Sequence, residues 1–244
     1  MKVITENCTA EIVEKKSRFI ANIFYVDNEI KVEEKLEYTR KKFYGARHNC
    51  YAYILGESGN VVKSSDDGEP QGTAGHPILD ILKGEELTNC IVIVTRYFGG
   101  TLLGTGGLVR AYSDAVKEAL KNASLSYLYE GYIVNFDIDY DEYGKIENIT
   151  SGINGKYANN NPNMSSDSNE NNIRQSIGKV SFDNLPIKSI SKNFEGAIKL
   201  VYLVRDNVFD EFKAQISNIT RGKISLEKNE KKLYYISDKE IVYL

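Results

Sequence analysis

Short apolar runs alternate with longer runs of helical period through the first half of the chain. Strands are predicted over residues 11–13, 18–25, 48–55, 61–64 and 90–95. Helices are predicted over residues 28–43, 77–82 and 108–121. Asp27 is the expected N-cap of the first helix. The run 90–95 is continuously apolar and β-branched, which predicts a central strand covered on both faces.

The same kind of pattern restarts after a boundary near residues 124–130. Its strands are predicted over residues 132–138, 187–190, 197–204 and within 223–236. Its helices are predicted over residues 141–149 and 206–219, the second capped by Asp206. The resulting order is βαββαβ, a ferredoxin-like pattern. The chain is therefore expected to be α+β with two domains, 1–126 and 130–244.

An asparagine- and serine-rich stretch interrupts the second domain. Residues 151–184 contain almost no apolar side chains, so their burial cannot offset the entropy lost on ordering. We predict a disordered insertion here. A loop that orders on contact with a partner is the functional alternative.

Composition restricts the partners. The 244 residues carry a formal net charge of -3, so an RNA-binding site has to be a local patch. The cysteines Cys8, Cys50 and Cys90 are widely spaced and fit neither a disulfide framework nor a zinc site. The N-terminus lacks a signal-peptide pattern and no apolar run reaches membrane-spanning length. A cytoplasmic protein without membrane association or cofactor is expected.

A glycine-rich segment follows the predicted strand 90–95 and leads into a helix. It holds five glycines: Gly99, Gly100, Gly104, Gly106 and Gly107. Bare backbone amides at a helix N-terminus favour anions, and Arg96 and Arg110 flank the segment as cations. Lys63 is a further candidate phosphate contact. The spacing matches neither a Walker A loop nor a dinucleotide fingerprint, and a tight strand-to-helix connection is the structural alternative.

An acidic loop precedes the helix predicted at 77–82. Asp66, Asp67 and Glu69 are close enough in sequence to share a proton, and Asp66 and Asp67 are weak candidates for Mg²⁺ or Ca²⁺ ligands. Alternatively, the aspartates cap backbone N–H groups, or the acids pair with Arg96 and Arg110.

His48 is one of two histidines. It could act as a general base if Asp66 or Asp67 oriented it, although a lone histidine is more often a packed, hydrogen-bonded residue. Cys50 lies two residues further along the same strand, and nothing in its surroundings suggests a depressed thiol pKa.

These segments resemble the YigZ/IMPACT family over about residues 15–123. The resemblance rests on the strings HNCYAY, SDDGEPQGTAGHP and VTRYFGGTLLGTGGLVRAYSDAV. It implies a first domain like domain two of a small-subunit ribosomal protein, with a mixed sheet and helices on one face. By pattern alone, the second domain resembles a late domain of elongation factor G. The family's polar set corresponds to His48, Asp66, Asp67, Gly68, Glu69, Gly72, Arg96, Gly99, Gly100, Gly104, Gly106, Gly107 and Arg110.

Two features depart from the family pattern. His76 stands where a small or basic residue is expected, and the asparagine-rich insertion changes the second domain. Eukaryotic relatives regulate translation under amino-acid starvation by competing for the activator of a protein kinase. An additional N-terminal domain assists them, so that mechanism is not transferred to this chain.

Three hypotheses follow. The first is a non-catalytic, translation-associated or stress-linked regulator that binds RNA or the ribosome. The second is a hydrolase-like enzyme for a phosphorylated or peptide-like small molecule, using Asp66, Asp67 and Glu69 with Arg96 and Arg110. The third is a protein-interaction module whose second domain docks a partner. The oligomeric state is left open.

Overall fold

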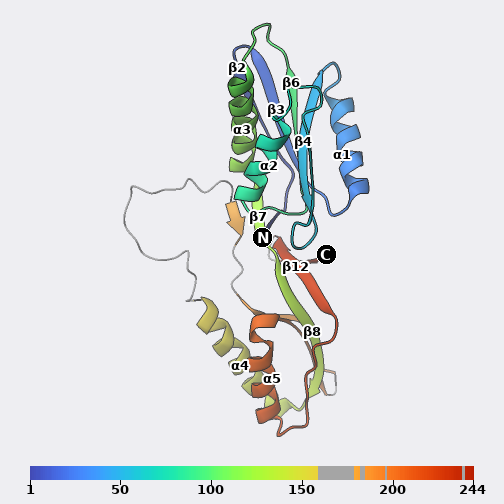
Figure 1. Ribbon diagram of the computed structural model, residues 1–244. Coiled ribbons are helices and arrows are strands. Elements are labelled where there is room, and N and C mark those ends of the chain that lie inside the picture. Colours follow the sequence, from blue (N-terminus) through green and yellow to red (C-terminus); the bar gives the residue numbers. More distant parts are fainter. Residues whose placement is uncertain (159–178, 182–184, 196, 238–239) are drawn as a thin grey trace, which may run out of the picture. The chain divides into compact units, whose positions relative to one another are not determined.

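The structure is a computed structural model that describes residues 1–158, 179–181, 185–195, 197–237 and 240–244. Two compact units divide these residues (Figure 1). Unit 1 comprises Met1–Tyr127 and, from later in the chain, the strand Lys179–Ser181. Unit 2 contains the remaining described residues, from Leu128 onward. Each unit combines helices with a sheet, which confirms the predicted α+β class and two-domain layout.

Unit 1 is built on a five-stranded sheet. Its strands, in spatial order, are β2 (Cys8–Glu14), β3 (Ser17–Tyr25), β6 (Cys90–Tyr97), β4 (His48–Leu55) and β5 (Val61–Ser65). Every neighbouring pair is antiparallel, so the expected mixed sheet is wrong for this layer. The β2–β3 turn is only Lys15–Lys16, both at positive φ, a geometry that suits a tight hairpin.

Helices cover both faces of this sheet, so the prediction of helices on one face is also wrong (Figure 1). α2 (Gly75–Gly84) and α3 (Thr105–Lys121) pack on one face, and α1 (Glu29–Lys42) packs on the other. The reason lies in β6, which is apolar on both sides. Val92 and Val94 join the core under α2 and α3, while Ile91 and Ile93 join the core under α1.

Local signals at the helix ends were partly misread. The side chain of Asn28, rather than Asp27, caps α1 by accepting a hydrogen bond from the Lys31 amide. α3 begins at Thr105, so Gly106 and Gly107 are helical rather than part of the preceding loop.

A second, three-stranded sheet in unit 1 has the order β1 (Lys2–Ile4), β7 (Ser124–Tyr127), β9 (Lys179–Ser181). The sequence patterns did not predict these short strands. β9 pairs in parallel with β7, although it falls inside the segment predicted to be disordered. That prediction is therefore wrong for residues 179–181.

Unit 2 has the predicted βαββαβ order followed by one more strand. Its elements are β8 (Tyr129–Ile138), α4 (Tyr140–Ala158), β10 (Ile187–Asn193), β11 (Ile198–Arg205), α5 (Asp206–Ile219), β12 (Lys231–Ser237) and β13 (Glu240–Tyr243). The strands lie in the antiparallel order β10-β11-β8-β12-β13. α4 and α5 pack on one face over a shared apolar core.

Two predictions in unit 2 need correction. The helix α4 continues to Ala158, and its Ile146, Ile149 and Ile153 pack into the core at helical spacing. Residues 151–158 are thus helical rather than disordered, while 159–178 and 182–184 lie outside the described residues. Asp206 is the first residue of α5 and not its cap, since Arg205 occupies that position without a side-chain hydrogen bond.

Candidate functional site

The polar residues singled out in the sequence gather mainly at one end of the five-stranded sheet. Strand register places Ile12, Phe19, Arg96 and His48 in one row across four strands, so their side chains share the face covered by α2 and α3. At the same end lie the β2–β3 turn, the β6–α3 loop, the start of β4 and the loop from β5 to α2. We call these connections together the loop end of unit 1.

Asp66 holds the start of α2 in place. Its carboxylate accepts hydrogen bonds from the amides of Gly72 (2.8 Å), Ala74 (2.9 Å) and Gly75 (2.8 Å). Partial burial tends to raise the pKa of the Asp66 carboxyl, but these backbone bonds outweigh it and hold the pKa below its ordinary value of 3.8. The charge of Asp66 therefore serves the backbone of its own loop.

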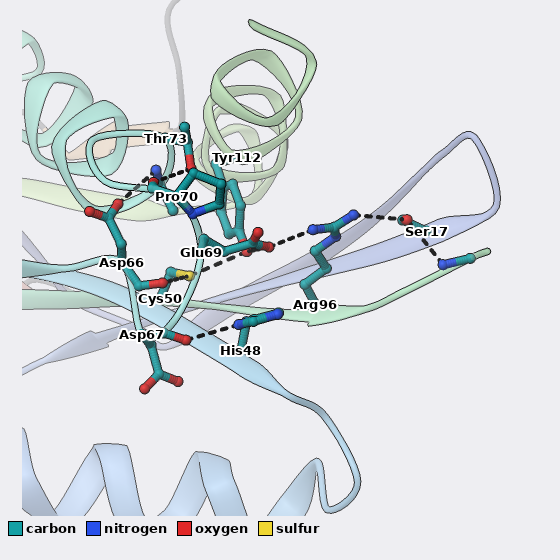
Figure 2. Close-up of polar contacts among 12 residues, drawn as sticks. Ser17, His48, Cys50, Asp66, Asp67, Glu69, Pro70, Thr73, Arg96 and Tyr112 are labelled. Carbon is teal, nitrogen blue, oxygen red and sulfur yellow. Dashed lines mark hydrogen bonds and ion pairs between the residues drawn. The ribbon is translucent and has the colours of Figure 1, made fainter. Parts of the chain in front are cut away.

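Asp67 connects the acidic loop to β4. Its carboxylate oxygen accepts a hydrogen bond of 2.7 Å from the backbone amide of Asn49. Its backbone carbonyl lies 2.9 Å from Nδ1 of His48, and because a carbonyl only accepts, Nδ1 carries the proton in this contact. Figure 2 shows the carboxylate of Asp67 pointing away from the imidazole. The group that orients His48 is thus a peptide carbonyl and not a carboxylate.

Glu69 and Arg96 form a buried ion pair. Nη1 of Arg96 lies 2.6 Å from Oε1 of Glu69, and the two side chains are only 7% and 4% exposed. The hydroxyl of Tyr112, on α3, donates to the same carboxylate oxygen at 2.8 Å. Nη2 of Arg96 lies 3.4 Å from Oγ of Ser17, while its buried Nε has no hydrogen-bond partner among the described residues. Figure 2 shows this chain of contacts.

Cys50 packs against the same network. Its Sγ donates to the carbonyl oxygen of Asp66 at 2.9 Å and lies 3.2 Å from the hydroxyl of Tyr112. Burial raises the pKa of the Cys50 thiol well above its ordinary value. Burial likewise raises the pKa of the Tyr112 hydroxyl, with the nearby Cys50 and Glu69 adding to the effect. Both groups are therefore protonated at neutral pH, and Cys50 is unsuited to be a nucleophile.

The three carboxylates of the acidic loop do not converge. Asp66 binds three backbone amides, Asp67 binds the Asn49 amide, and Glu69 binds Arg96 and Tyr112. Within the described parts of the chain, no three His, Cys, Asp or Glu side chains are grouped as ligands of a metal ion. Among those same residues, no helix is both long and apolar enough to cross a bilayer.

The glycine-rich segment lies against the β2–β3 turn. The amide of Gly99 donates to Oγ of Ser17 at 3.1 Å. A Cβ at Gly99 would lie 2.0 Å from the carbonyl carbon of Lys16, so only glycine fits. Gly100 and Gly104 have φ of +85° and +72°, and Gly104 is the N-cap of α3. The segment between them exposes Leu102.

Arg110 is separate from the buried network. It lines a cavity of about 250 Å³ under the β2–β3 hairpin, together with Ile12, Glu14, Lys15, Leu103, Gly107, Ala111 and Asp114. Its exposed side chain forms no ion pair or hydrogen bond with another described residue. Lys63 is further away still in the fold, because it pairs with Tyr53 on the α1 side of the sheet. The cleft expected from the sequence is thus a buried cluster plus separate surface cations.

Sequence reasoning missed several residues of the buried cluster. Tyr112 lies within the helix predicted over residues 108–121, but helical spacing says nothing about the partner of a hydroxyl. Ser17 and Phe19 face Arg96 because of strand register, which depends on a hairpin turn that the apolar pattern did not locate. Lys15-Lys16 is not one of the Asn, Asp or Gly pairs that signal a two-residue hairpin, so the sequence offered no clear signal for that turn.

Comparison with known proteins identifies the class to which this fold and site belong. The family model of the Impact N-terminal domain matches residues 15–120, the part of the chain that carries the buried cluster and the glycine-rich segment. A solved structure described as that of a hypothetical protein aligns over 94% of this chain and 97% of its own, with a TM-score of 0.51 and 27% identity.

Two bacterial relatives make the assignment specific. IMPACT family member YvyE of Bacillus subtilis is 44% identical over 138 residues, which are 57% of this chain and 64% of the relative, so the match spans just under two thirds of that protein. IMPACT family member YigZ of Escherichia coli is 36% identical over 147 residues, which are 59% of this chain and 72% of the relative. The chain belongs to the IMPACT family.

Proposed function

We propose that this protein is a non-catalytic, translation-associated regulator that binds RNA or the ribosome through the loop end of unit 1. The observation that supports this most is a division of charge. The acids of the loop end are mostly engaged internally, whereas the cations Lys15, Lys16, Arg47 and Arg110 are exposed and form no ion pair with any described residue. Beside them, Glu14 and Asp114 are carboxylates that likewise form no ion pair within the described chain.

Unpaired, solvated cations are the groups that phosphates can reach without breaking the fold. A polyanion that binds them releases its own counterions, which gives salt-dependent affinity. The membership in the IMPACT family supports the same direction, because the resemblance implies that eukaryotic members regulate translation. The likeness of the two domains to a ribosomal-protein domain and a late elongation-factor domain is part of this proposal.

The hydrolase-like alternative has less support from the geometry. Asp66, Asp67 and Glu69 each have protein hydrogen-bond donors on their carboxylates, and they face different partners. The thiol of Cys50 is buried and its pKa is raised. A hydrolytic site needs a base or metal that can reach a substrate, and these groups are occupied.

The test is RNA binding by the full chain, measured by fluorescence anisotropy with a labelled RNA of about 20 nucleotides at several salt concentrations. Arg110→Ala and the double variant Lys15→Ala/Lys16→Ala are expected to weaken binding. Each is also expected to reduce the salt slope by about one for every phosphate that is no longer neutralised. Lys83→Ala is the matched control, because Lys83 is an exposed lysine near the C-terminal end of α2, away from the loop end. Absence of salt-dependent binding by the unmodified chain would refute direct RNA binding through the loop end.

A further inference from the structure

Two apolar side chains are exposed beside the cations of the loop end. Phe98 is 54% exposed and Leu102 is 83% exposed, both in the loop that joins β6 to α3. The neighbouring Gly99 packs directly on the backbone of Lys16. The loop therefore presents a half-exposed aromatic ring one residue before the point where it packs on the basic β2–β3 turn.

The ring of Phe98 contacts Arg96, and the backbone next to it is fixed by a hydrogen bond. The guanidinium carbon of Arg96 lies 5.6 Å from the centroid of the Phe98 ring and 5.4 Å from that of the buried Phe19. Arg96 is itself fixed by Glu69. On the other side of Phe98 along the chain, the amide of Gly99 is tied to Ser17. The buried ion pair thus supports a half-exposed aromatic ring on a fixed backbone.

We propose that Phe98 is a stacking platform for an unpaired RNA base, and that Lys15 and Lys16 contact the phosphates beside that base. The inference rests on the proposed RNA-binding function and specifies which form of RNA it takes. Proteins that bind single strands combine aromatic rings with a positively charged track, because every base has a face that can stack. In a duplex the bases stack on one another, so no base face along the helix is open to a ring such as Phe98.

Charge favours RNA over an apolar protein surface as the occupant of this site. Lys15 and Lys16 form the turn on which Gly99, the residue after Phe98, packs. Both lysines are exposed and form no ion pair with a described residue, so an apolar protein surface would have to desolvate them without compensation. Phosphates compensate both charges.

The experiment compares two forms of one RNA with the full chain. A single strand of about 12 nucleotides carrying 2-aminopurine reports stacking as fluorescence quenching, and the same strand annealed to its complement provides the duplex. The unmodified protein is expected to quench the probe and to bind the single strand more tightly. Phe98→Leu, which keeps apolar bulk without a ring, is expected to lose about tenfold in single-strand affinity and most of the quenching, with its salt slope unchanged.

Three controls separate the outcomes. Phe98→Tyr is expected to restore stacking, and Ile30→Ala removes a 73% exposed apolar residue on α1 without effect. Lys15→Ala/Lys16→Ala is expected to weaken both RNA forms and to lower the salt slope. If Phe98→Leu binds and quenches like the unmodified chain, the stacking role is wrong while RNA binding stands. If the unmodified chain binds neither form, the stacking role and direct RNA binding both fail.

Discussion

The carboxylates of the acidic loop are engaged with the protein, whereas the glycine-rich segment exposes apolar side chains. Both segments lie at the loop end of unit 1. In the acidic loop, Asp66, Asp67 and Glu69 turn inward and each is hydrogen-bonded to the protein. The glycine-rich segment turns outward and exposes Phe98 and Leu102. The comparison shows that a dense group of charged residues can serve to stabilise the fold. The surface that is open to ligands is formed instead by a loop of glycines and exposed apolar side chains.

The difference arises because the backbones of the two segments have different requirements. The loop from β5 to α2 has to satisfy the amides of Gly72, Ala74 and Gly75 at a helix start, and a carboxylate does this best. The glycine-rich segment needs only close approach to Lys16 and positive φ at Gly100 and Gly104. Charged side chains are needed where buried backbone N–H groups require an acceptor, and glycines are sufficient where the chain only has to turn.

Among the variants that test this comparison, removal of the buried ion pair should lower the free energy of unfolding the most. Glu69→Ala leaves the guanidinium of Arg96 buried without its carboxylate, so we expect the free energy of unfolding to fall by about 3–5 kcal/mol. Urea denaturation followed by circular dichroism measures it. The matched control is Glu14→Ala, which removes an exposed carboxylate that pairs with no described residue at the same end and should be nearly neutral. A decrease below about 1 kcal/mol in Glu69→Ala would show that the pair is not buried in solution.

Adding a methyl group under the outward loop should have the next largest effect. A Cβ at Gly99 overlaps the carbonyl of Lys16, so Gly99→Ala must displace the loop, and we expect stability to fall by about 1–3 kcal/mol. The control is Gly106→Ala in the first turn of α3, where a Cβ meets no described atom within 4 Å. Alanine is the better helix former, so this variant should be neutral or slightly stabilised. Similar destabilisation of both variants would contradict the packing of Gly99 on the hairpin turn.

Much of the fold was readable from the apolar pattern. The strand 48–55 and the helix 206–219 were predicted with the bounds that the structure has, because each has strong periodicity and clear turn residues at its ends. The short strands β1, β7 and β9 were not predicted, since three or four residues give no period. The helix α4 was cut short because the polar composition after residue 150 outweighed the apolar spacing of Ile149, Ile153 and Tyr157.

The candidate site was readable in part. The turn-forming alternative for the acidic loop describes Asp66 and Asp67, and the ion-pair alternative holds for Glu69 with Arg96 but not for Arg110. Sequence spacing could not distinguish the two arginines. Arg96 follows the alternation of a central strand and points into the core, whereas Arg110 lies on the exposed side of α3. That difference depends on which elements cover which side chain, which is a property of tertiary packing.

The cap at the start of α2 should have a smaller, pH-dependent effect. Asp66→Asn keeps one acceptor oxygen but removes the charge, so we expect stability to fall by about 1–2 kcal/mol at pH 7. The folded-state pKa of Asp66 is lowered, so its contribution is present above the ordinary pKa near 4 and is lost as the pH falls through the lowered value. Urea midpoints at pH 7 and pH 3 should therefore differ less in Asp66→Asn than in the unmodified chain. An equal pH dependence would assign the acid sensitivity to other carboxylates.

Arg110 should have the smallest effect on stability, which sharpens the contrast with Arg96. Its side chain is exposed and makes no ion pair with a described residue, so Arg110→Ala should change Tm by less than about 2 °C. Arg96→Ala, by comparison, should unfold at a much lower temperature, because it removes a buried partner of Glu69. Differential scanning fluorimetry of the two variants measures both values. If Arg110→Ala were as destabilising as Arg96→Ala, Arg110 would belong to the structural network, and weaker RNA binding by that variant would no longer indicate a phosphate contact.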